Sequence, residues 1–239
     1  MSKKWVIADV HGCFKTLKAL MEDKVCPTTG DTLYFLGDYI DRGPQSKEVI
    51  DYIRTLQLSD LHVIALMGNH EESMIQSILE ARSQKKKWLG IFKKALYTRN
   101  AWYTFGGETT MQSFGLEDPA LIPDEYFEWL NGLHNYAIEE EYLLAHAGFN
   151  FNIDNIFEDK DSMRWIRDFT VDLKKTGGKK VIHGHVPVPL ELVQESVKNP
   201  NFSFIDLDNG CVFKSRSGMG NLIGFELNSK ELLIQKNID

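Results

Sequence analysis

The stretch LYFLGDYIDRG, residues 33–43, joins an apolar run directly to a turn that contains two carboxylates and an arginine and is bounded by glycines. A short apolar run that leads into a glycine is typical of a buried strand that ends in a tight turn. The arrangement recurs, since apolar runs also precede DVHG (9–12), GNHE (68–71), HAG (146–148) and HGH (183–185). The five fragments contain five of the seven histidines. We interpret them as loops at strand ends that share one functional site.

The sequence around these fragments predicts an α/β fold. Residues 14–23, 45–58, 71–96 and 123–133 have apolar side chains at helical spacing, and in the first half such stretches alternate with strand-like runs. Short strand-like pieces dominate beyond residue 178, at 180–182, 190–193, 202–207, 211–213, 222–227 and 232–235. We therefore expect two packed mixed β-sheets flanked by helices, with the site where loops leave the strand ends. Because fragments from both halves would share this site, residues 1–239 are predicted to form a single domain.

Composition restricts the class of protein further. The chain has 43% hydrophobic residues, enough for a substantial core, and no apolar run approaches the roughly 20 residues that span a bilayer. A soluble, cytoplasmic protein without membrane contact is expected. Cys13, Cys26 and Cys211 are widely spaced and odd in number, which favours reduced thiols. The formal charge of −7 argues against a nucleic-acid partner.

The polar residues of the fragments match the ligands of a pair of divalent ions. Such ions take carboxylate, imidazole and amide oxygen together, and two ions about 3.5–4 Å apart need a bridging carboxylate and further ligands for each. Asp9 and His11 are two residues apart, so on an extended backbone both can reach the same ion. The predicted ligand set is Asp9, His11, Asp38, Asn69, His146 and His185.

Taken in order, the fragments DVHG, GDYIDRG, GNHE, HAG and GHV resemble the metal-dependent phosphoprotein phosphatases among the calcineurin-like metallophosphoesterases, in particular the short bacterial and bacteriophage-lambda-type members. The resemblance covers roughly residues 5 to 227. Further matches are Trp102 with Gly106-Gly107, the segment Trp165-Ile166-Arg167-Asp168 and the late segment 205–213. An ordered set of this kind is specific, although any single fragment is weak.

This resemblance implies a role for each predicted site residue. Asp9, His11 and Asp38 would bind one ion, and Asn69, His146 and His185 would bind a second ion that shares Asp38. Manganese is the expected metal, with iron and zinc also compatible. A hydroxide that bridges the ions would attack phosphorus in line with the leaving group. Arg42 and Arg167 would bind the phosphate oxygens, and His70, held by Asp41, would protonate the leaving group.

Several alternatives remain open at this level. A serine/threonine phosphoprotein phosphatase is the first hypothesis, a diadenosine polyphosphate hydrolase of the same family is the alternative, and a non-catalytic phosphate-binding module is a third. A phosphorylated protein and a small phosphoester are therefore both candidate substrates. Arg164 competes with Arg167 for the phosphate role. Val186 and Asn209 stand where relatives usually have threonine, which concerns the surroundings of the ligands and not the ligands themselves.

Overall fold

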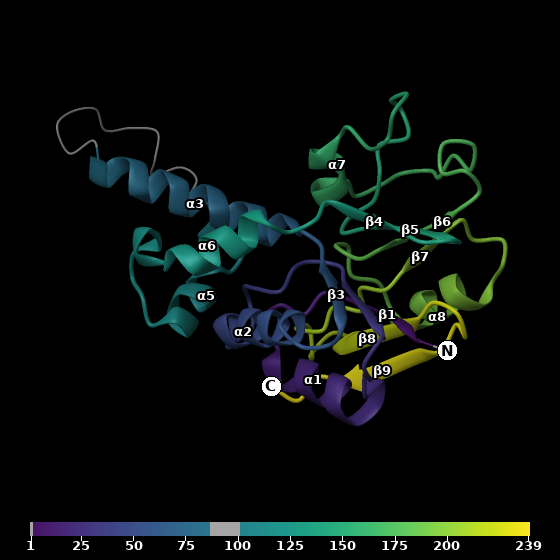
Figure 1. Cartoon of the computed structure of the whole chain (residues 1–239), viewed down its shortest axis with the longest axis horizontal. Coiled ribbons are helices and arrows are strands. Elements are labelled where there is room, and N and C mark those ends of the chain that lie inside the picture. The colour runs from purple at the N-terminus through teal and green to yellow at the C-terminus, as the bar shows by residue number, and fades with distance from the viewer. Residues whose placement is uncertain (1, 87–100) are drawn as a thin grey trace.

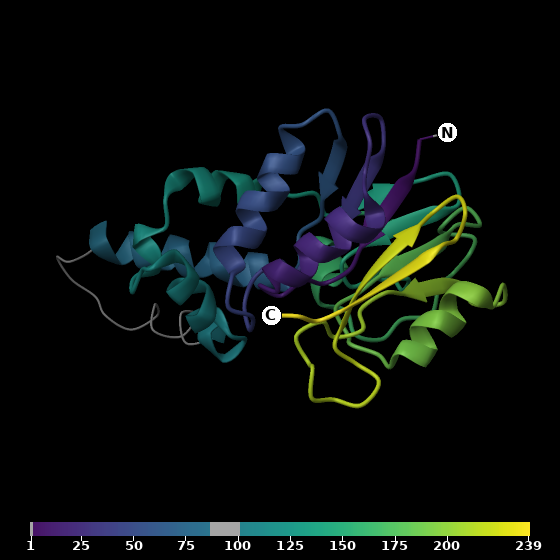
Figure 2. The same cartoon turned by 90° about the horizontal axis from the view of Figure 1, so that it is seen from below.

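The computed structural model describes residues 2–86 and 101–239. Two sheets pack face to face with helices around them (Figures 1 and 2). The first sheet has the order β3-β2-β1-β8-β9, and the second has the order β4-β5-β6-β7. The expected α/β architecture of two packed mixed sheets is thus confirmed.

The first sheet combines a parallel half and an antiparallel half. Its strands are β1 (Lys4–Ile7), β2 (Thr32–Phe35), β3 (His62–Ala65), β8 (Asn221–Glu226) and β9 (Leu232–Lys236). β1, β2 and β3 are parallel, with Val6 opposite Tyr34 and Tyr34 opposite Ile64, whereas β8 pairs antiparallel with β1. The carboxyl ends of the three parallel strands therefore meet at one edge.

The second sheet is built in the same mixed way. Its strands are β4 (Tyr136–Ile138), β5 (Tyr142–Ala145), β6 (Lys180–His183) and β7 (Phe204–Asp206). β5, β6 and β7 are parallel, and β4 pairs antiparallel with β5. This sheet brings the HAG and HGH fragments to a common edge.

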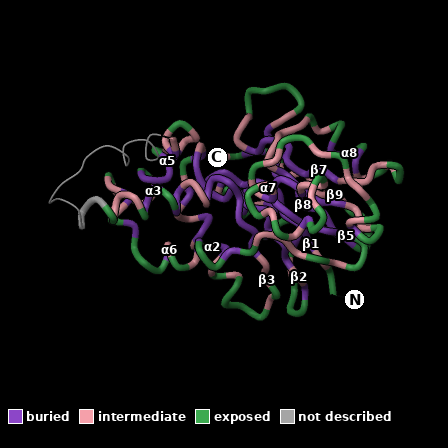
Figure 3. The backbone as a smooth tube through the Cα atoms, turned by 90° about the horizontal axis from the view of Figure 1, so that it is seen from above, coloured by how far each residue is buried: buried purple, intermediate pink, exposed green. Residues whose placement is uncertain are grey.

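Alternation along β1 explains how the layers pack. Val6 belongs to a buried cluster that joins the two sheets and includes Leu144 and Ile182. Trp5 and Ile7 point to the opposite face, where they join a cluster with residues of the helices α1 (Phe14–Ala19) and α2 (Ser46–Gln57). Because both faces are covered, the central strands β1, β2, β5 and β8 are mostly buried and apolar, and Figure 3 shows buried backbone in the interior of the molecule.

The helices lie outside the sheets. They are α1 (Phe14–Ala19) with a π-helical turn (Leu20–Val25), α2 (Ser46–Gln57), α3 (Asn69–Lys86), α5 (Gly107–Phe114), a 3₁₀ turn (Pro119–Leu121), α6 (Asp124–Asn131), α7 (Lys160–Trp165) and α8 (Leu190–Lys198). α3, α5 and α6 form a group on one side of the molecule (Figure 1). The part of the predicted 71–96 helix beyond residue 86 lies outside the described residues. Within residues 2–86 and 101–239, no helix has both the length and the apolar character needed to cross a bilayer.

Two local predictions were wrong. Residues 190–193 were expected to form a strand, but they begin α8, where Leu190, Val193 and Val197 share one face against the cluster between the sheets. Residues 211–213 were also expected to be a strand. They belong instead to a series of turns, in which the Phe213 amide donates to Gly210 O over 2.8 Å.

Candidate metal centre

The predicted ligands follow the carboxyl ends of parallel strands in both sheets, three strands in the first sheet and two in the second. Asp9 and His11 follow β1, Asp38 follows β2, Asn69 begins the helix after β3, His146 follows β5, and His185 follows β6. The turns are sharp, since five non-glycine residues of the predicted site have positive φ, namely His11, Asp38, Asp41, Arg42 and His185. Such backbone is strained and is concentrated at functional sites. The loops thus turn polar side chains inward above the strand ends.

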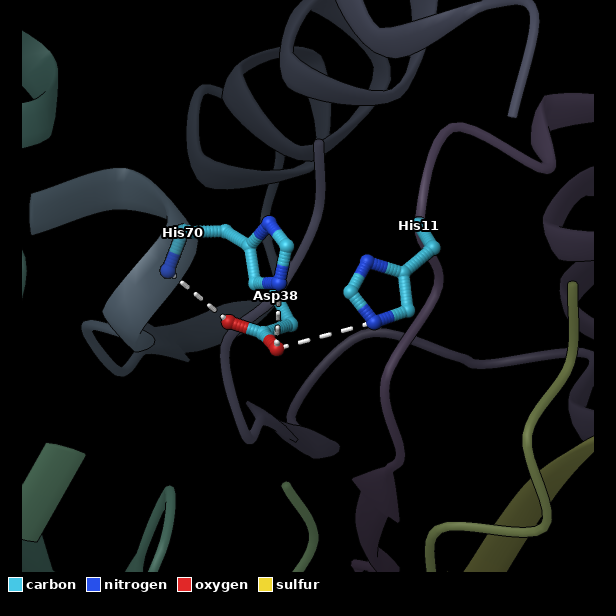
Figure 4. Close-up of side chains that lie close together, drawn as sticks. All are labelled: His11, Asp38 and His70. Atoms are coloured by element: carbon cyan, nitrogen blue, oxygen red, sulfur yellow. Dashed lines mark hydrogen bonds and ion pairs between the residues drawn. The ribbon is translucent and has the colours of Figure 1, made fainter. Parts of the chain in front are cut away.

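Asp38 lies at the centre of this arrangement. Its Oδ2 lies 3.6 Å from His11 Nε2 and 3.7 Å from His70 Nε2. Figure 4 draws these contacts as dashed lines. Its Oδ1 lies 3.3 Å from His146 Nε2. Two groups of donor atoms, each within 4.8 Å of one another, therefore share this carboxylate. One group is Asp38 with His11 and His70, and the other is Asp38 with His146 and His185.

The remaining predicted ligands lie in the same place. Asn69 Oδ1 lies 2.9 Å from His185 Nδ1 and 3.1 Å from His146 Nε2. Asp9 Oδ2 accepts a hydrogen bond of 3.0 Å from the His185 amide. Residues from both halves of the chain therefore converge on one point.

Two of the imidazoles are oriented by backbone carbonyls behind them. His11 Nδ1 lies 2.9 Å from Ile40 O, and His146 Nδ1 lies 3.2 Å from Leu36 O. Because a carbonyl only accepts, Nδ1 of each ring must carry the hydrogen, which leaves Nε2 of each ring with its lone pair on the side of Asp38. Burial lowers the pKa of both histidines well below the ordinary value, so the rings are neutral and able to bind a metal.

The donor set fits divalent cations. Burial raises the pKa of Asp9 and of Asp38, and neighbouring carboxylates, Asp208 for Asp9 and Glu71 for Asp38, raise each further. Three buried side-chain atoms in this region, Asp9 Oδ1, His185 Nε2 and Asp208 Oδ2, have no hydrogen-bond partner among the described residues. Buried carboxylates and lone pairs that face each other without donors are stabilised by a bound cation.

His70 and Asp41 form a second element beside the ligands. His70 Nδ1 lies 2.7 Å from Asp41 Oδ2, and both side chains are buried. Asp41 also accepts hydrogen bonds from Trp102 Nε1 over 2.9 Å and from Thr110 Oγ1 over 2.6 Å. Burial raises the pKa of Asp41 to about 7, although these two hydrogen bonds and the charge of Arg42 act in the opposite direction.

The three candidate arginines differ in their surroundings. Arg42 Nη1 lies 2.6 Å from His11 Nε2, and its Nη2 lies 3.0 Å from His70 Nε2, which places its guanidinium over the site. Arg164 is bound elsewhere, with Nη2 3.0 Å from Glu72 and 2.6 Å from Asp161. Arg167 is exposed and forms no ion pair with any residue that the structure describes. Burial lowers the pKa of His185 to about 4, and the positive charge of Arg167 is the next largest cause of this lowering.

Sequence reasoning assigned no specific contact to two acidic residues. Glu71 is fully buried and accepts hydrogen bonds from the amides of Asp38, Tyr39 and Gly68 over 2.8–3.0 Å, which joins two of the loops. Asp208 is buried near Asp9 and accepts a 2.7 Å hydrogen bond from the Gly210 amide. Glu71 lies in the fragment GNHE, and Asp208 lies in the late segment 205–213. The spacing of residues in the sequence does not predict the backbone amides that these two carboxylates bind.

The sequence of this chain matches a known protein family and several named relatives. The family model described as calcineurin-like phosphoesterase matches residues 2–217. A bis(5'-nucleosyl)-tetraphosphatase PrpE (asymmetrical) from Geobacillus thermodenitrificans is 26% identical over 240 residues, which cover 87% of this chain and 85% of that protein. A symmetrical bis(5'-nucleosyl)-tetraphosphatase from Vibrio cholerae is 27% identical over 146 residues, which cover 61% of this chain and 44% of that protein.

The relatives named symmetrical match over a smaller part of their own length, between 27% and 44%. Among solved structures, the cold-active protein-tyrosine phosphatase of a psychrophilic Shewanella species superposes with a TM-score of 0.58 at 16% identity. The alignment covers 99% of this chain and 81% of that chain. At this level of identity the likeness concerns the fold alone.

Proposed function

The chain belongs to the calcineurin-like phosphoesterase family, and from that premise we propose that it hydrolyses dinucleoside polyphosphates. A relative that aligns over 87% of this chain and 85% of its own length is named an asymmetrical tetraphosphatase. This evidence reverses the order of the two hypotheses from the sequence, in which the phosphoprotein phosphatase came first. The observation that carries hydrolysis itself is the shared position of Asp38 between two groups of ligand atoms.

The proposal assigns the ligands as the resemblance implied. Asp9, His11 and Asp38 would hold one ion, and Asn69, His146 and His185, again with Asp38, would hold the other. When bound, a pair of such ions lowers the pKa of water and neutralises charge on the phosphate. Manganese is the proposed metal, because its intermediate hardness suits imidazole, carboxylate and amide oxygen together. All these residues would lie in one domain that spans residues 1–239.

Arg42 and Arg167 would bind the non-bridging phosphate oxygens. A planar guanidinium donates two parallel hydrogen bonds to such oxygens. In the structure Arg42 Nη2 donates toward His70 Nε2, since arginine has no acceptor. When Arg42 turns to a phosphate, His70 Nε2 becomes free to hold a proton. His70 would then protonate the leaving oxygen while Asp41 keeps the ring oriented through Nδ1.

The His70–Asp41 pair also favours a second candidate, a serine/threonine phosphoprotein phosphatase. An alkoxide that leaves from a serine or threonine ester is a strong base and needs an acid, whereas a phosphate that leaves from an anhydride needs less help. The pair is buried and fully formed, so both substrate classes deserve a direct comparison.

The test compares kcat/KM for diadenosine tetraphosphate with that for a phosphoserine peptide, both with Mn²⁺. A higher value for the dinucleotide supports the proposal, and a higher value for the peptide reverses the order. An Asp38→Asn variant serves as the control, because activity at this centre must fall with it. If protein with metal bound hydrolyses neither substrate, the result supports the third hypothesis, a non-catalytic phosphate-binding module.

A further inference from the structure

The loop between β7 and β8 places an aromatic ring near Arg42 and a second arginine over that ring. The Phe213 ring centroid lies 5.7 Å from Arg42 Cζ and 4.0 Å from Arg216 Cζ. Phe213 is half-buried, whereas Arg216 is exposed and forms no ion pair with any described residue. The Arg216 guanidinium thus lies over the Phe213 ring, and this stacked pair of flat groups begins beside the arginine of the proposed phosphate site.

The backbone of this loop is held firmly. Asn209 is buried, and its Nδ2 donates to Val188 O over 2.9 Å and to Gly218 O over 2.8 Å. Asn221 Nδ2 donates to Asn209 Oδ1 over 2.7 Å. These bonds fix both ends of the series of turns that contains Phe213. Asn209 is one of the two positions at which the sequence departs from the resembled pattern, and here it has a structural role.

Close packing over Gly210 also fixes the position of the Phe213 ring. A Cβ atom on Gly210 would lie 2.8 Å from Phe213 Cδ2 and 3.2 Å from Pro187 Cβ, so the ring packs closely over a residue without a side chain. Gly210 has φ of +63°, which favours glycine as well. The ring therefore stays in place without a ligand, which reduces the entropy lost on binding.

We propose that Phe213 and Arg216 bind the nucleobase of a nucleotide whose phosphate is held at Arg42. Bases stack on aromatic rings and on guanidinium planes, and the contact tolerates any base because every base has a π-face. One sugar separates a base from its first phosphate, which suits an aromatic ring next to the phosphate-binding arginine. Arg216 also adds positive charge beside a polyphosphate in a chain of net charge −7. This inference rests on the proposed function, because it names how the same site would recognise that substrate.

The test separates the base from the phosphates. Variants Phe213→Leu and Arg216→Gln remove the flat faces and keep most of the volume, Phe213→Tyr keeps the ring, and Lys198→Ala, an exposed position on α8, is the control. The first measurement is the ratio of kcat/KM for diadenosine tetraphosphate to that for inorganic tripolyphosphate. We expect this ratio to fall roughly 10- to 100-fold in Phe213→Leu, less in Arg216→Gln, and to stay near wild type in Phe213→Tyr and Lys198→Ala.

A binding measurement keeps the two proposals distinguishable. Calorimetry in EDTA, where metal-dependent turnover is absent, compares the Kd for ATP with that for tripolyphosphate. Wild-type protein should prefer ATP, and Phe213→Leu should lose that preference. Equal affinity of the wild type for both ligands, or an unchanged preference in the variants, overturns the inference. A protein that prefers ATP through Phe213 but does not hydrolyse diadenosine tetraphosphate would refute the proposed function and leave this inference standing.

Discussion

His70 Nδ1 lies 2.7 Å from a carboxylate oxygen of Asp41, and neither side chain is reached by solvent to more than 1%. Asp41 is itself fixed by Trp102 and Thr110. A histidine bound in this way can rotate little, so its Nε2 stays directed toward Asp38 and the centre. The pair therefore has the geometry of an oriented proton donor.

The first prediction concerns His70→Asn. We expect turnover of a phosphoserine substrate to fall by about 10²–10⁴, the usual contribution of a general acid, while the metal content stays at its wild-type value. An aryl phosphate, whose leaving group is a weaker base, should lose much less. Steady-state kinetics with metal analysis of the same samples measure both effects.

The matched control for this prediction is His62→Asn, at an exposed position at the start of β3. Equal losses with the aryl and the alkyl substrate would show that His70 acts in another way than as an acid. A loss of metal together with activity would assign His70 to the ligands, next to which it lies.

The second prediction concerns stability with and without metal. Asp9, Asp38 and Asp208 are buried close together, and burial with mutual repulsion raises the pKa of Asp9. A bound cation relieves this repulsion, so Mn²⁺ should stabilise the folded state. At 100 times its Kd the gain is about 2.7 kcal/mol, which corresponds to a rise in Tm of roughly 5–10 °C for a chain of this size.

Differential scanning calorimetry with Mn²⁺ or EDTA measures this shift. The variant Asp38→Asn is the control, because it removes the shared carboxylate, and its Tm should respond little to Mn²⁺. A wild-type Tm that is the same in both solutions would argue against a metal at these residues.

The third prediction concerns Glu71→Gln. The Glu71 carboxylate accepts from the amides of Asp38 and Gly68 at one oxygen and from the Tyr39 amide at the other. Glutamine has a single acceptor oxygen, so at least one buried amide would face an NH₂ group. We expect a loss of about 1.5–3 kcal/mol in the free energy of unfolding, the range for hydrogen bonds to a charged group, together with weaker metal binding.

Glu72→Gln is the matched control for Glu71. Its carboxylate contacts Arg164 and Trp165 near the surface, where one ion pair contributes about 0–1 kcal/mol. Urea unfolding of the two variants gives the comparison. Equal destabilisation would mean that the three amides find other partners.

The fold could be predicted where packing leaves a pattern in the sequence. β1 is buried on both faces, so it appears as a continuous apolar run, and the neighbouring β2 does the same. The segment from Leu190 could not be assigned in this way, since a short apolar run fits a strand and a buried helix equally well. The contact of α8 with the cluster between the sheets decides between them, and that contact is formed by distant residues.

The candidate site shows the same division. Ligand types and glycines mark each loop, so the convergence of Asp9, Asn69 and His185 could be anticipated from the order of the fragments. The partners of Asp41 could not, because Trp102 and Thr110 lie 61 and 69 residues away and no spacing marks a hydrogen bond of that range. The assigned roles of these residues stay predictions until variants are measured.

The last prediction separates the two neighbouring arginines. Arg164 is paired with Glu72 and Asp161, and its Nη1 lies 3.3 Å from Asn135 Oδ1, so both of its Nη atoms already have partners, while its buried Nε has none among the described residues. Arg167 is exposed and has no ion pair with the described residues, yet its charge acts on His185. We therefore expect Arg167→Ala to lower kcat/KM by roughly 10- to 100-fold, the effect of losing a charge-assisted hydrogen bond to phosphate, with unchanged stability.

Arg164→Ala should show the opposite profile. It leaves Glu72 without its ion pair and should lower the free energy of unfolding by about 1 kcal/mol, with a smaller effect on kcat/KM because the loss reaches the site only through α7. Lysine at position 167 should restore part of the activity, since it keeps the charge but not the planar fork. If Arg164→Ala impairs binding of inorganic phosphate while Arg167→Ala does not, the phosphate role belongs to Arg164, and its ion pairs must open when substrate binds.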